Sequence, residues 1–312
     1  MESARNFEIK NNTGKPFLKM VYGDTDSLYI SYENLIDSIE GSENWTIEQT
    51  RDFLVKLNRE FLDEHNCEFL KQYYESRHAH SFHEFELETI ALSGCFLDVK
   101  KRYAQILLWK DGKIFDLDKL PLKIKGLEMI KSSVPSAARN ILKELVRYLL
   151  EDSEEGFLLQ RLNIKMQEMK KKFYESAEKD IESVCGNLKV NGYTKYILDD
   201  KNPSGLIVAP KCPPGPRALG NYNRMRQLNH LKGDPLYGGK IKWYVYQPLP
   251  GSKDREYFGF AGSDYPDWAP QYAPIDVAAM FQQFVLDPFN RILEAMKLGT
   301  LVSDGSIQMS LF

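Results

Sequence analysis

Two short runs of apolar and aromatic residues, 17–22 and 27–32, lie near the start of the chain. Gly and Asp separate these runs at residues 23–26. Aromatic and β-branched side chains favour strands, whereas Gly and Asp favour turns. The pattern therefore predicts a β-hairpin whose turn carries two carboxylates.

A helical period follows the hairpin. Apolar residues recur at three- and four-residue spacing from Phe53 to Leu62, and again from Phe69 to Tyr73. Both Thr46 and Thr50 are suitable N-terminal caps for such a helix. The sequence predicts a long amphipathic helix that begins at one of these two threonines.

The remaining pattern divides at about Pro135. Before it, strands are predicted over 85–90, 103–109 and 113–115, with a tight turn at Asp111-Gly112. After it, the predicted elements are helices over 136–151, 155–186 and 275–298, a connection over 203–216 and a strand over 241–246. We therefore expect an α+β fold, with one part over residues 1–134 and a mainly helical part over 135–299.

The composition is that of a folded globular chain. It has 312 residues, of which 43% are hydrophobic and 27% charged, and this length suggests about two domains. No apolar run approaches the ~20 residues that span a bilayer, and no secretory signal is visible, so we expect no membrane partner. The scattered cysteines form no CxxC pair, which argues against a zinc ribbon or a disulfide framework and favours the cytoplasm.

The charge is distributed unevenly, although the net charge is only −3. Residues 31–99 carry 15 acidic and 5 basic side chains, whereas residues 100–147 carry 12 basic and 5 acidic ones. Residues 211–256 are again basic, with 9 basic and 3 acidic side chains. A polyanion could bind the two basic blocks, although solvated charged faces would give the same pattern.

The predicted hairpin carries the clearest candidate chemistry. Asp24 and Asp26 are two residues apart, so in an extended chain they point to the same face. Two carboxylates on one face can bind Mg²⁺, which prefers a few carboxylates together with water and substrate phosphates. The alternative is a solvent-facing turn, where Asp and Gly are common.

Residues 22–27 (YGDTDS) resemble the third palm motif of family B DNA-dependent DNA polymerases. The resemblance implies that Asp26 is the principal ligand of a two-Mg²⁺ site, and that Asp24 assists directly or through the outer shell. About 75 residues later, Lys100-Lys101-Arg102-Tyr103 resembles the KKRY motif of the same family. That motif grips the primer near its 3′ end, whereas a basic strand edge is the alternative.

Two further segments resemble parts of tailed-phage members of this family. Residues 121–135 are similar to the passage from palm to thumb, and residues 217–224 to a thumb loop that touches the duplex. The candidates for contacts with DNA are therefore Lys123, Lys125, Lys131, Arg217, Tyr222 and Arg224. A surface loop without DNA contacts remains the alternative for the second segment.

Residues 85–89 (FELET) allow two interpretations. They are faintly similar to the acidic first motif of 3′–5′ exonucleases, with Glu86 and Glu88 as metal ligands. Their position between the hairpin and KKRY instead matches a palm strand, with Glu88 in an accessory role near the metal site, and this is the interpretation we favour. A nearby histidine group (His78, His80 and His83) lacks cysteines at zinc-finger spacing, so a structural metal is the weaker hypothesis there.

The C-terminal residues 308–312 (QMSLF) follow a Gly-Ser hinge and resemble short clamp-binding peptides. The resemblance implies a flexible tail over 300–312 in which Gln308, Leu311 and Phe312 anchor a sliding clamp. Such a tether would raise the effective concentration of the protein on DNA. A frayed terminus with chance apolar residues is the alternative.

Two motifs expected of the family are not found in the chain: the earlier palm motif with another metal-binding aspartate, and the fingers helix that holds the dNTP. We therefore expect a C-terminal polymerase subunit that acts on primer-template DNA only with an N-terminal polymerase subunit. That subunit would carry the exonuclease, the fingers and the rest of the palm, across a large interface. A split gene, a truncated polypeptide and a damaged gene fit this pattern. Alternative functions are a non-catalytic DNA- and clamp-binding module and a metal-dependent exonuclease.

Overall fold

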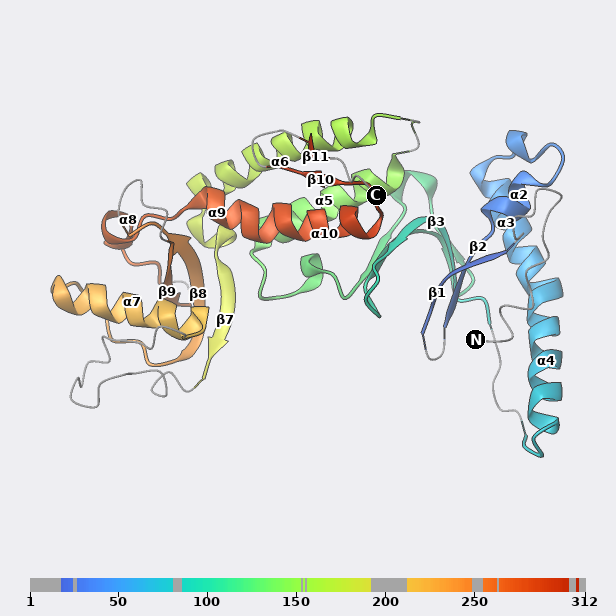
Figure 1. Ribbon diagram of the computed structural model, residues 1–312, viewed down its shortest axis with the longest axis horizontal. Coiled ribbons are helices and arrows are strands. Elements are labelled where there is room, and N and C mark those ends of the chain that lie inside the picture. Colours follow the sequence, from blue (N-terminus) through green and yellow to red (C-terminus); the bar gives the residue numbers. More distant parts are fainter. Residues whose placement is uncertain are drawn as a thin grey trace. The chain divides into compact units, whose positions relative to one another are not determined.

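The computed structural model describes residues 18–24, 27–80, 86–152, 154, 156–191, 212–248, 255–262, 264–302 and 307–308. The chain divides into two compact units, Met1–Lys125 (unit 1) and Gly126–Phe312 (unit 2). Both units combine helices with antiparallel strands, which confirms the predicted α+β class (Figure 1). None of the helices in the described residues combines the length and apolar character needed to cross a lipid bilayer.

Unit 1 contains a two-stranded hairpin and a four-stranded antiparallel sheet. Its strands are β1 (Lys19–Gly23), β2 (Leu28–Ser31), β3 (Thr89–Phe96), β4 (Tyr103–Lys110), β5 (Lys113–Ile114) and β6 (Leu122–Lys125). The hairpin pairs β1 with β2, as the sequence pattern predicts, and its register places Tyr22 opposite Tyr29. In the sheet β4 is central, because it pairs with β3, β5 and β6.

The helices of unit 1 form one long helical run and several short turns. They are α2 (Glu33–Asp37), η1 (Ser42–Asn44), α3 (Ile47–Leu57), the π-helical turn η2 (Asn58–Leu62), α4 (Asp63–Glu75) and η3 (Leu117–Lys119). Thr46 rather than Thr50 caps α3: the Gln49 N–H donates to its hydroxyl at 3.3 Å, and the Thr46 N–H donates to the Gln49 side chain at 2.8 Å. This reciprocal capping box satisfies two backbone donors that the first helical turn leaves unpaired.

The strand predicted over 85–90 is wrong for residues 86–88, which the structure describes outside any strand. Glu86 and Glu88 precede β3, which begins only at Thr89. The reason lies in the neighbouring strand: β4 ends at Lys110 and turns at Asp111-Gly112 into β5. The Asp111 N–H donates one hydrogen bond to the Glu88 carbonyl at 3.0 Å. In the described residues, the β3–β4 hydrogen-bond ladder does not continue beyond it.

Unit 2 combines a helical layer with a three-stranded antiparallel sheet. Its helices are η4 (Glu128–Ile130), α5 (Ser136–Glu151), α6 (Leu158–Lys179), η5 (Ile181–Val184), α7 (Pro214–Leu228), α8 (Ala269–Tyr272), α9 (Val277–Phe281), the π-helical η7 (Gln282–Leu286) and α10 (Asp287–Ala295). Its strands are β7 (Gly186–Val190), β8 (Gly239–Tyr246), β9 (Glu256–Ala261), β10 (Thr300–Leu301) and β11 (Ile307–Gln308). The predicted helix at 136–151 and the predicted strand at 241–246 are both present, as α5 and within β8.

The core of unit 2 joins these helices through buried apolar side chains. The aromatic rings of Phe173 on α6 and Phe281 on α9 meet edge to face, with centroids 5.6 Å apart. Both residues are almost fully buried. On the sheet, α7 packs against β9, and Tyr222 lies against Phe258 with ring centroids 5.9 Å apart.

The predicted helix over 155–186 ends seven residues early, at Lys179. Asp180 then caps the short helix η5 by accepting a hydrogen bond from the Glu182 N–H at 3.0 Å. Gly186 opens β7 opposite Trp243, and a β-carbon at this glycine would lie 2.7 Å from the indole nitrogen. Only glycine fits so close to the indole ring, so the chain forms a strand here despite its helical spacing.

The segment predicted as a loop over 217–224 lies within α7. Its Pro-Gly-rich start, taken as a connection, supplies the first helical turn from Pro214. Proline is tolerated there because its missing N–H would have no intrahelical partner. The sequence therefore begins a helix at residues that usually break one.

Candidate functional site

The turn of the β1–β2 hairpin holds Asp24 at its first corner. The Asp24 N–H donates to the Ser27 carbonyl at 2.9 Å, which closes the turn. The Asp24 side chain is only 9% exposed, so its carboxylate is directed toward protein rather than water. Asp26, the other predicted carboxylate, lies outside the described residues.

Four aromatic rings attach the hairpin to the sheet of unit 1. Tyr22 and Tyr29 come from the hairpin, and Phe96 and Tyr103 come from β3 and β4. Tyr22 stacks on Phe96 with centroids 5.4 Å apart, and Tyr29 lies 5.4 Å from the Tyr103 ring. Sequence reasoning missed this cluster, although aromatic residues in both hairpin strands were its visible signal. The cluster fixes the position of the carboxylate turn relative to the start of β4.

A basic turn lies beside the Asp24 carboxylate. Lys100, Lys101 and Arg102 form the connection between β3 and β4, and Tyr103 is the first residue of β4. The Lys101 ammonium nitrogen is 3.6 Å from Oδ2 of Asp24, and the Lys101 N–H donates to the Tyr22 hydroxyl at 2.7 Å. The structure thus brings together the two motifs that lie about 75 residues apart in the sequence.

Tyr103 lies within this arrangement rather than on its surface. It is 3% exposed, and its hydroxyl accepts a hydrogen bond from Tyr29 at 2.9 Å. Burial, followed by this hydrogen bond, raises the pKa of Tyr29 to about 12. The Tyr103 ring is therefore packed between the hairpin and the sheet and presents almost no exposed surface.

Glu88 and Lys123 form an ion pair next to the aromatic cluster. The Lys123 ammonium is 3.1 Å from Oε1 of Glu88, and it lies 6.0 Å from the centre of the Tyr103 ring. The Glu88 side chain is 58% exposed. Lys125, on the same strand, lies opposite Tyr103 and is exposed. The structure therefore gathers Glu88, Lys123 and KKRY around the same sheet.

Carboxylates are the donor class that Mg²⁺ prefers, so Asp24 is chemically suited to a metal site. The described residues contain no group of three or more His, Cys, Asp or Glu side chains placed to hold a metal ion. His78 and His80 form no such group, and His83 lies outside the described residues.

In unit 2 the predicted DNA-contacting residues differ in exposure. Lys131 is exposed and lies 3.3 Å from the carboxylate of Glu128, and Arg224 is exposed on α7. Arg217 is half-buried. Tyr222 is only 6% exposed, and its ring is tilted against that of Trp268 with centroids 5.5 Å apart. The Tyr222 ring thus belongs to the core of unit 2 and does not offer a face to a duplex in this conformation.

The predicted clamp-binding residues lie at the edge of the described chain. The backbone of Gln308 belongs to β11, where it pairs with Thr300 of β10. Leu311 and Phe312 lie outside the described residues. The first part of the predicted flexible tail therefore contains a short strand pair.

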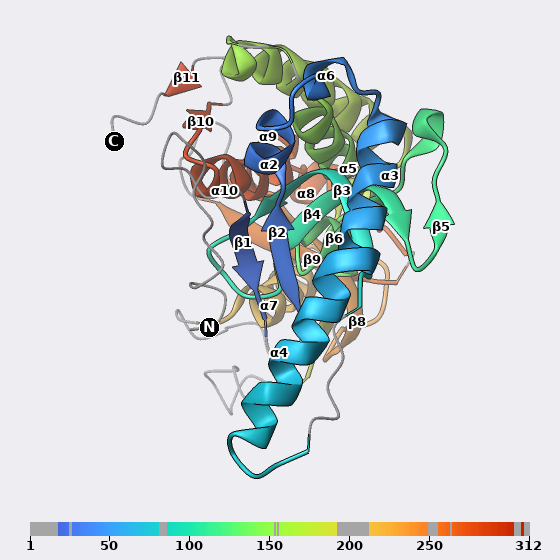
Figure 2. The same ribbon diagram turned by 90° about the vertical axis from the view of Figure 1, so that its right-hand side faces the viewer.

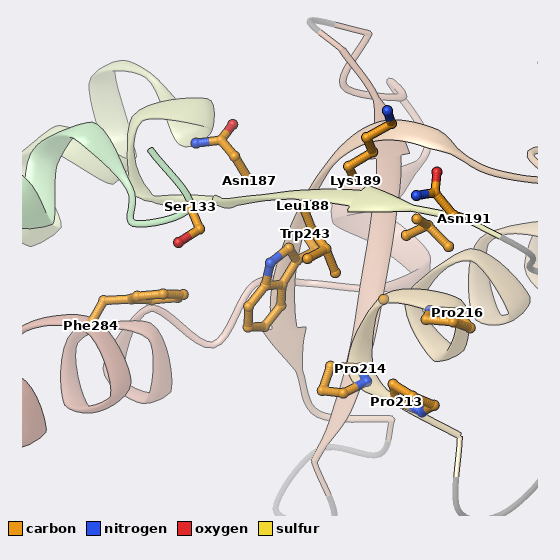
Figure 3. A pocket seen from close by; sticks show the side chains of 12 residues that line it. Ser133, Asn187, Leu188, Lys189, Asn191, Pro213, Pro214, Pro216, Trp243 and Phe284 are labelled. Carbon is orange, nitrogen blue, oxygen red and sulfur yellow. The ribbon is translucent and has the colours of Figure 1, made fainter. Parts of the chain in front are cut away.

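Unit 2 also has a cavity of about 440 Å³ that none of the predicted site residues line. Figure 3 shows the Trp243 ring between Phe284 and the prolines at the start of α7. Leu188 and Val190 of β7 complete its apolar wall.

Comparison with known proteins finds that most of this chain is similar to part of a DNA-directed DNA polymerase. No protein-family model matches the chain. It is 31% identical over 243 residues to the DNA-directed DNA polymerase of Escherichia phage RB69, and the match covers 75% of this chain. The matched region is therefore a tailed-phage DNA polymerase-like region. It spans only 25% of the phage RB69 protein, so the chain represents about a quarter of that polymerase.

Proposed function

We propose that this chain supplies the C-terminal palm and the thumb of a family B DNA polymerase. Residues 1–134 contribute to the palm, residues 135–299 form the thumb, and residues 300–312 form a clamp-binding tail. The observation that carries the proposal is the ion pair between Asp24 and Lys101, which joins the carboxylate turn to the KKRY turn. The 31% identity to a phage DNA polymerase supports the same proposal.

In this proposal Asp26 and Asp24 hold Mg²⁺ and Glu88 has an accessory role. When bound, Mg²⁺ activates the primer 3′-hydroxyl and neutralises charge on the leaving pyrophosphate. The chain's own contribution is orientation. The aromatic cluster and the Lys101 contact fix the Asp24 carboxylate before DNA arrives, so little ordering is needed on binding.

The basic residues bind the primer-template through its phosphates. Lys100 and Arg102 lie in the turn beside Lys101, and Lys123 and Lys125 lie on β6 of the same sheet. Lysine and arginine bind phosphates without reading sequence, so the affinity for DNA should fall steeply with salt. In the thumb, Lys131, Arg217 and Arg224 make further contacts with the phosphate backbone of the duplex. Tyr222 supports α7 from within the core.

Another polypeptide region completes the site. It carries the exonuclease, the fingers that hold the dNTP, and the palm strand with the remaining metal-binding aspartate. Gln308, Leu311 and Phe312 then tether the assembled enzyme to a sliding clamp. The chain spans about a quarter of the length of the phage RB69 polymerase.

Primer extension tests this proposal. The chain is mixed with the N-terminal part of the phage RB69 polymerase, ending before its counterpart of this chain, and extension is measured with Mg²⁺. We expect extension only from the mixture. Asp26→Asn should reduce it by roughly 10²–10⁴-fold, the equivalent of several kcal/mol of lost charge stabilisation.

Asp98→Asn is the matched control, because Asp98 is an exposed aspartate in the β3–β4 turn. It should extend primers at the rate of the unchanged chain. Extension that survives Asp26→Asn contradicts the site assignment, and a mixture that does not extend primers contradicts the complementation. Deletion of residues 306–312 should leave distributive synthesis intact and remove stimulation by a clamp.

A further inference from the structure

Helix α4 of unit 1 is long, yet none of its side chains is buried. The helix contains 13 residues. In Figures 1 and 2 its C-terminal part continues beyond the ends of the β1–β2 hairpin. Helices of about 12–15 residues are only marginally stable alone in water, and most helical stability in proteins comes from packing of an apolar face. Helix α4 continues the run of α3 and η2, which is anchored by buried Leu54 and Leu62, so its own exposed face is left for a partner.

One face of the η2–α4 run carries a row of ring-bearing side chains. Phe61, His65, Phe69 and Tyr73 follow one another at four-residue intervals and form what we call the aromatic stripe. Residues four apart lie on the same side of a helix, one above the other. Phe61 stacks on His65 with centroids 4.8 Å apart, and Phe69 stacks on Tyr73 at 6.3 Å.

The aromatic side chains of the stripe are exposed to solvent. The exposed fractions are 52% for Phe61, 42% for Phe69 and 43% for Tyr73. At the end of the stripe, the Arg77 guanidinium lies 3.7 Å from the centre of the Tyr73 ring. Exposed apolar side chains gathered on one face mark interaction sites, and aromatic residues and arginine are the side chains that most often dominate such sites.

The charge around the stripe selects between nucleic acid and protein. The stripe lies in the acidic block of the chain, where residues 31–99 carry 15 acidic and 5 basic side chains. Along the η2–α4 run, Glu60, Glu64 and Glu68 adjoin the stripe. These carboxylates would repel phosphates, so the aromatic rings do not form a stacking platform for single-stranded DNA. They favour an apolar protein groove with a basic rim.

We propose that the aromatic stripe is the docking surface for the polymerase region that completes this chain. This inference rests on the function proposed above and adds the surface that the complement occupies. The chain spans about a quarter of the length of the phage RB69 polymerase, and the stripe offers the proposed complement a helix with no buried residue from Asp63 to Glu75. The complementary region forms a groove that receives this helix, and the apolar walls of the groove cover Phe61, Phe69 and Tyr73.

A binding experiment with paired variants tests the docking surface. The probe is the N-terminal part of the phage RB69 polymerase, and its affinity is measured for the unchanged chain, for Phe69→Asp and for Cys67→Asp. Cys67 is exposed and lies two residues from Phe69, on the opposite face of the same helix, so both variants add one negative charge at an exposed position. Phe69→Asp should raise the Kd roughly 30-fold or more, as expected for an interface anchor. Cys67→Asp should leave it within about twofold of the unchanged value.

Two further measurements make the result specific. Circular dichroism should show equal helix content in both variants, and Phe69→Leu should restore binding because it keeps an apolar side chain. Amide hydrogen exchange at residues 63–75 should slow when the probe is added. Equal binding by Phe69→Asp and the unchanged chain, with extension still dependent on Asp26, overturns the docking surface and leaves the proposed function intact.

The remaining outcomes overturn the inference in distinguishable ways. Self-association that Phe69→Asp abolishes would identify a second copy of this chain as the occupant. A matching loss of DNA affinity in the isolated chain would identify nucleic acid. A probe that neither binds the unchanged chain nor extends primers with it would contradict the proposed function as well.

Discussion

Lys101 is held against Asp24 by its backbone as well as by its side chain. The Lys101 ammonium lies 3.6 Å from the Asp24 carboxylate, and its N–H donates to the hydroxyl of Tyr22, two residues before Asp24. Both contacts depend on a left-handed backbone at Lys101, where φ is 62°. A residue with a β-carbon is strained in this region, so the turn gives up some stability to aim its ammonium at the carboxylate.

Two substitutions at this position should separate backbone from side chain. Lys101→Met removes the ion pair and keeps the strain, whereas Lys101→Gly removes both. We expect Lys101→Gly to be more stable than Lys101→Met by about 1 kcal/mol, because glycine enters the left-handed region without steric cost. Urea unfolding of the two variants measures the difference. A Lys101→Met protein that equals or exceeds Lys101→Gly in stability would show that the backbone at this turn is relaxed.

Tyr29→Phe should weaken the attachment of the hairpin to the sheet. The substitution removes the hydrogen bond to Tyr103, whose own hydroxyl is buried, and should cost about 1 kcal/mol of unfolding free energy. Tyr29 has a pKa of about 12 in the folded chain, against 10.0 as its ordinary value. Its raised pKa therefore adds stability that is fully present below pH 10 and is lost as the pH rises toward 12.

The alkaline part of this prediction has its own control. Stability measured from pH 8 to pH 12 should fall less steeply in Tyr29→Phe than in the unchanged chain. Tyr237→Phe should keep the steeper fall, because Tyr237 is 49% exposed. Parallel curves for Tyr29→Phe and the unchanged chain would mean that Tyr29 ionises equally in the folded and unfolded states.

The local sequence pattern was enough to predict those helices, strands and turns that depend on only a few neighbouring residues. The hairpin at β1–β2, the turn at Asp111-Gly112 and helix α5 follow from apolar spacing and turn residues. The end of α6 could not be predicted in this way. It is set by Trp243, 57 residues after Gly186, whose indole requires glycine at the start of β7. Long-range packing of this kind overrides helical spacing.

The candidate site shows the same division. The carboxylate turn and KKRY were visible as motifs, because each is a short string with its own chemistry. The contact between Asp24 and Lys101 was not visible, since it depends on the stacking of Tyr22 against Phe96 across two different sheets. The burial of Tyr222 was missed for a similar reason: its helical environment was taken as a loop.

Thr46→Ala should destabilise the start of helix α3. The substitution removes the hydroxyl that accepts the Gln49 N–H, and loss of such a cap costs about 1 kcal/mol. Thr50→Ala provides the comparison, because Thr50 lies inside the helix, where alanine is at least as favourable as threonine. Thermal unfolding should therefore rank Thr46→Ala below both Thr50→Ala and the unchanged chain. The opposite ranking would place the functional cap at Thr50.

The segment between α5 and α6 should make unit 2 sensitive to acid. Arg161 donates to both carboxylate oxygens of Asp152, at 2.8 Å and 2.6 Å, and also to the carbonyl groups of Glu154 and Gly156. Its hydrogen bonds hold the pKa of Asp152 below the ordinary value of 3.8. A lowered pKa means that the pair contributes stability above pH 3.8, and that this contribution is lost as the pH falls through the folded-state pKa.

Asp152→Asn should therefore be less stable than the unchanged chain at pH 7, with the two converging below about pH 3.8 as Asp152 becomes protonated. Urea unfolding followed by circular dichroism from pH 7 to pH 3 measures this convergence. Glu154→Gln is the matched control, because the Glu154 side chain is 77% exposed and its Oε2 lies 3.4 Å from the same arginine. It should follow the unchanged chain at every pH. A constant gap between Asp152→Asn and the unchanged chain down to pH 3 would show that the lost stability comes from packing of the side chain and not from its charge.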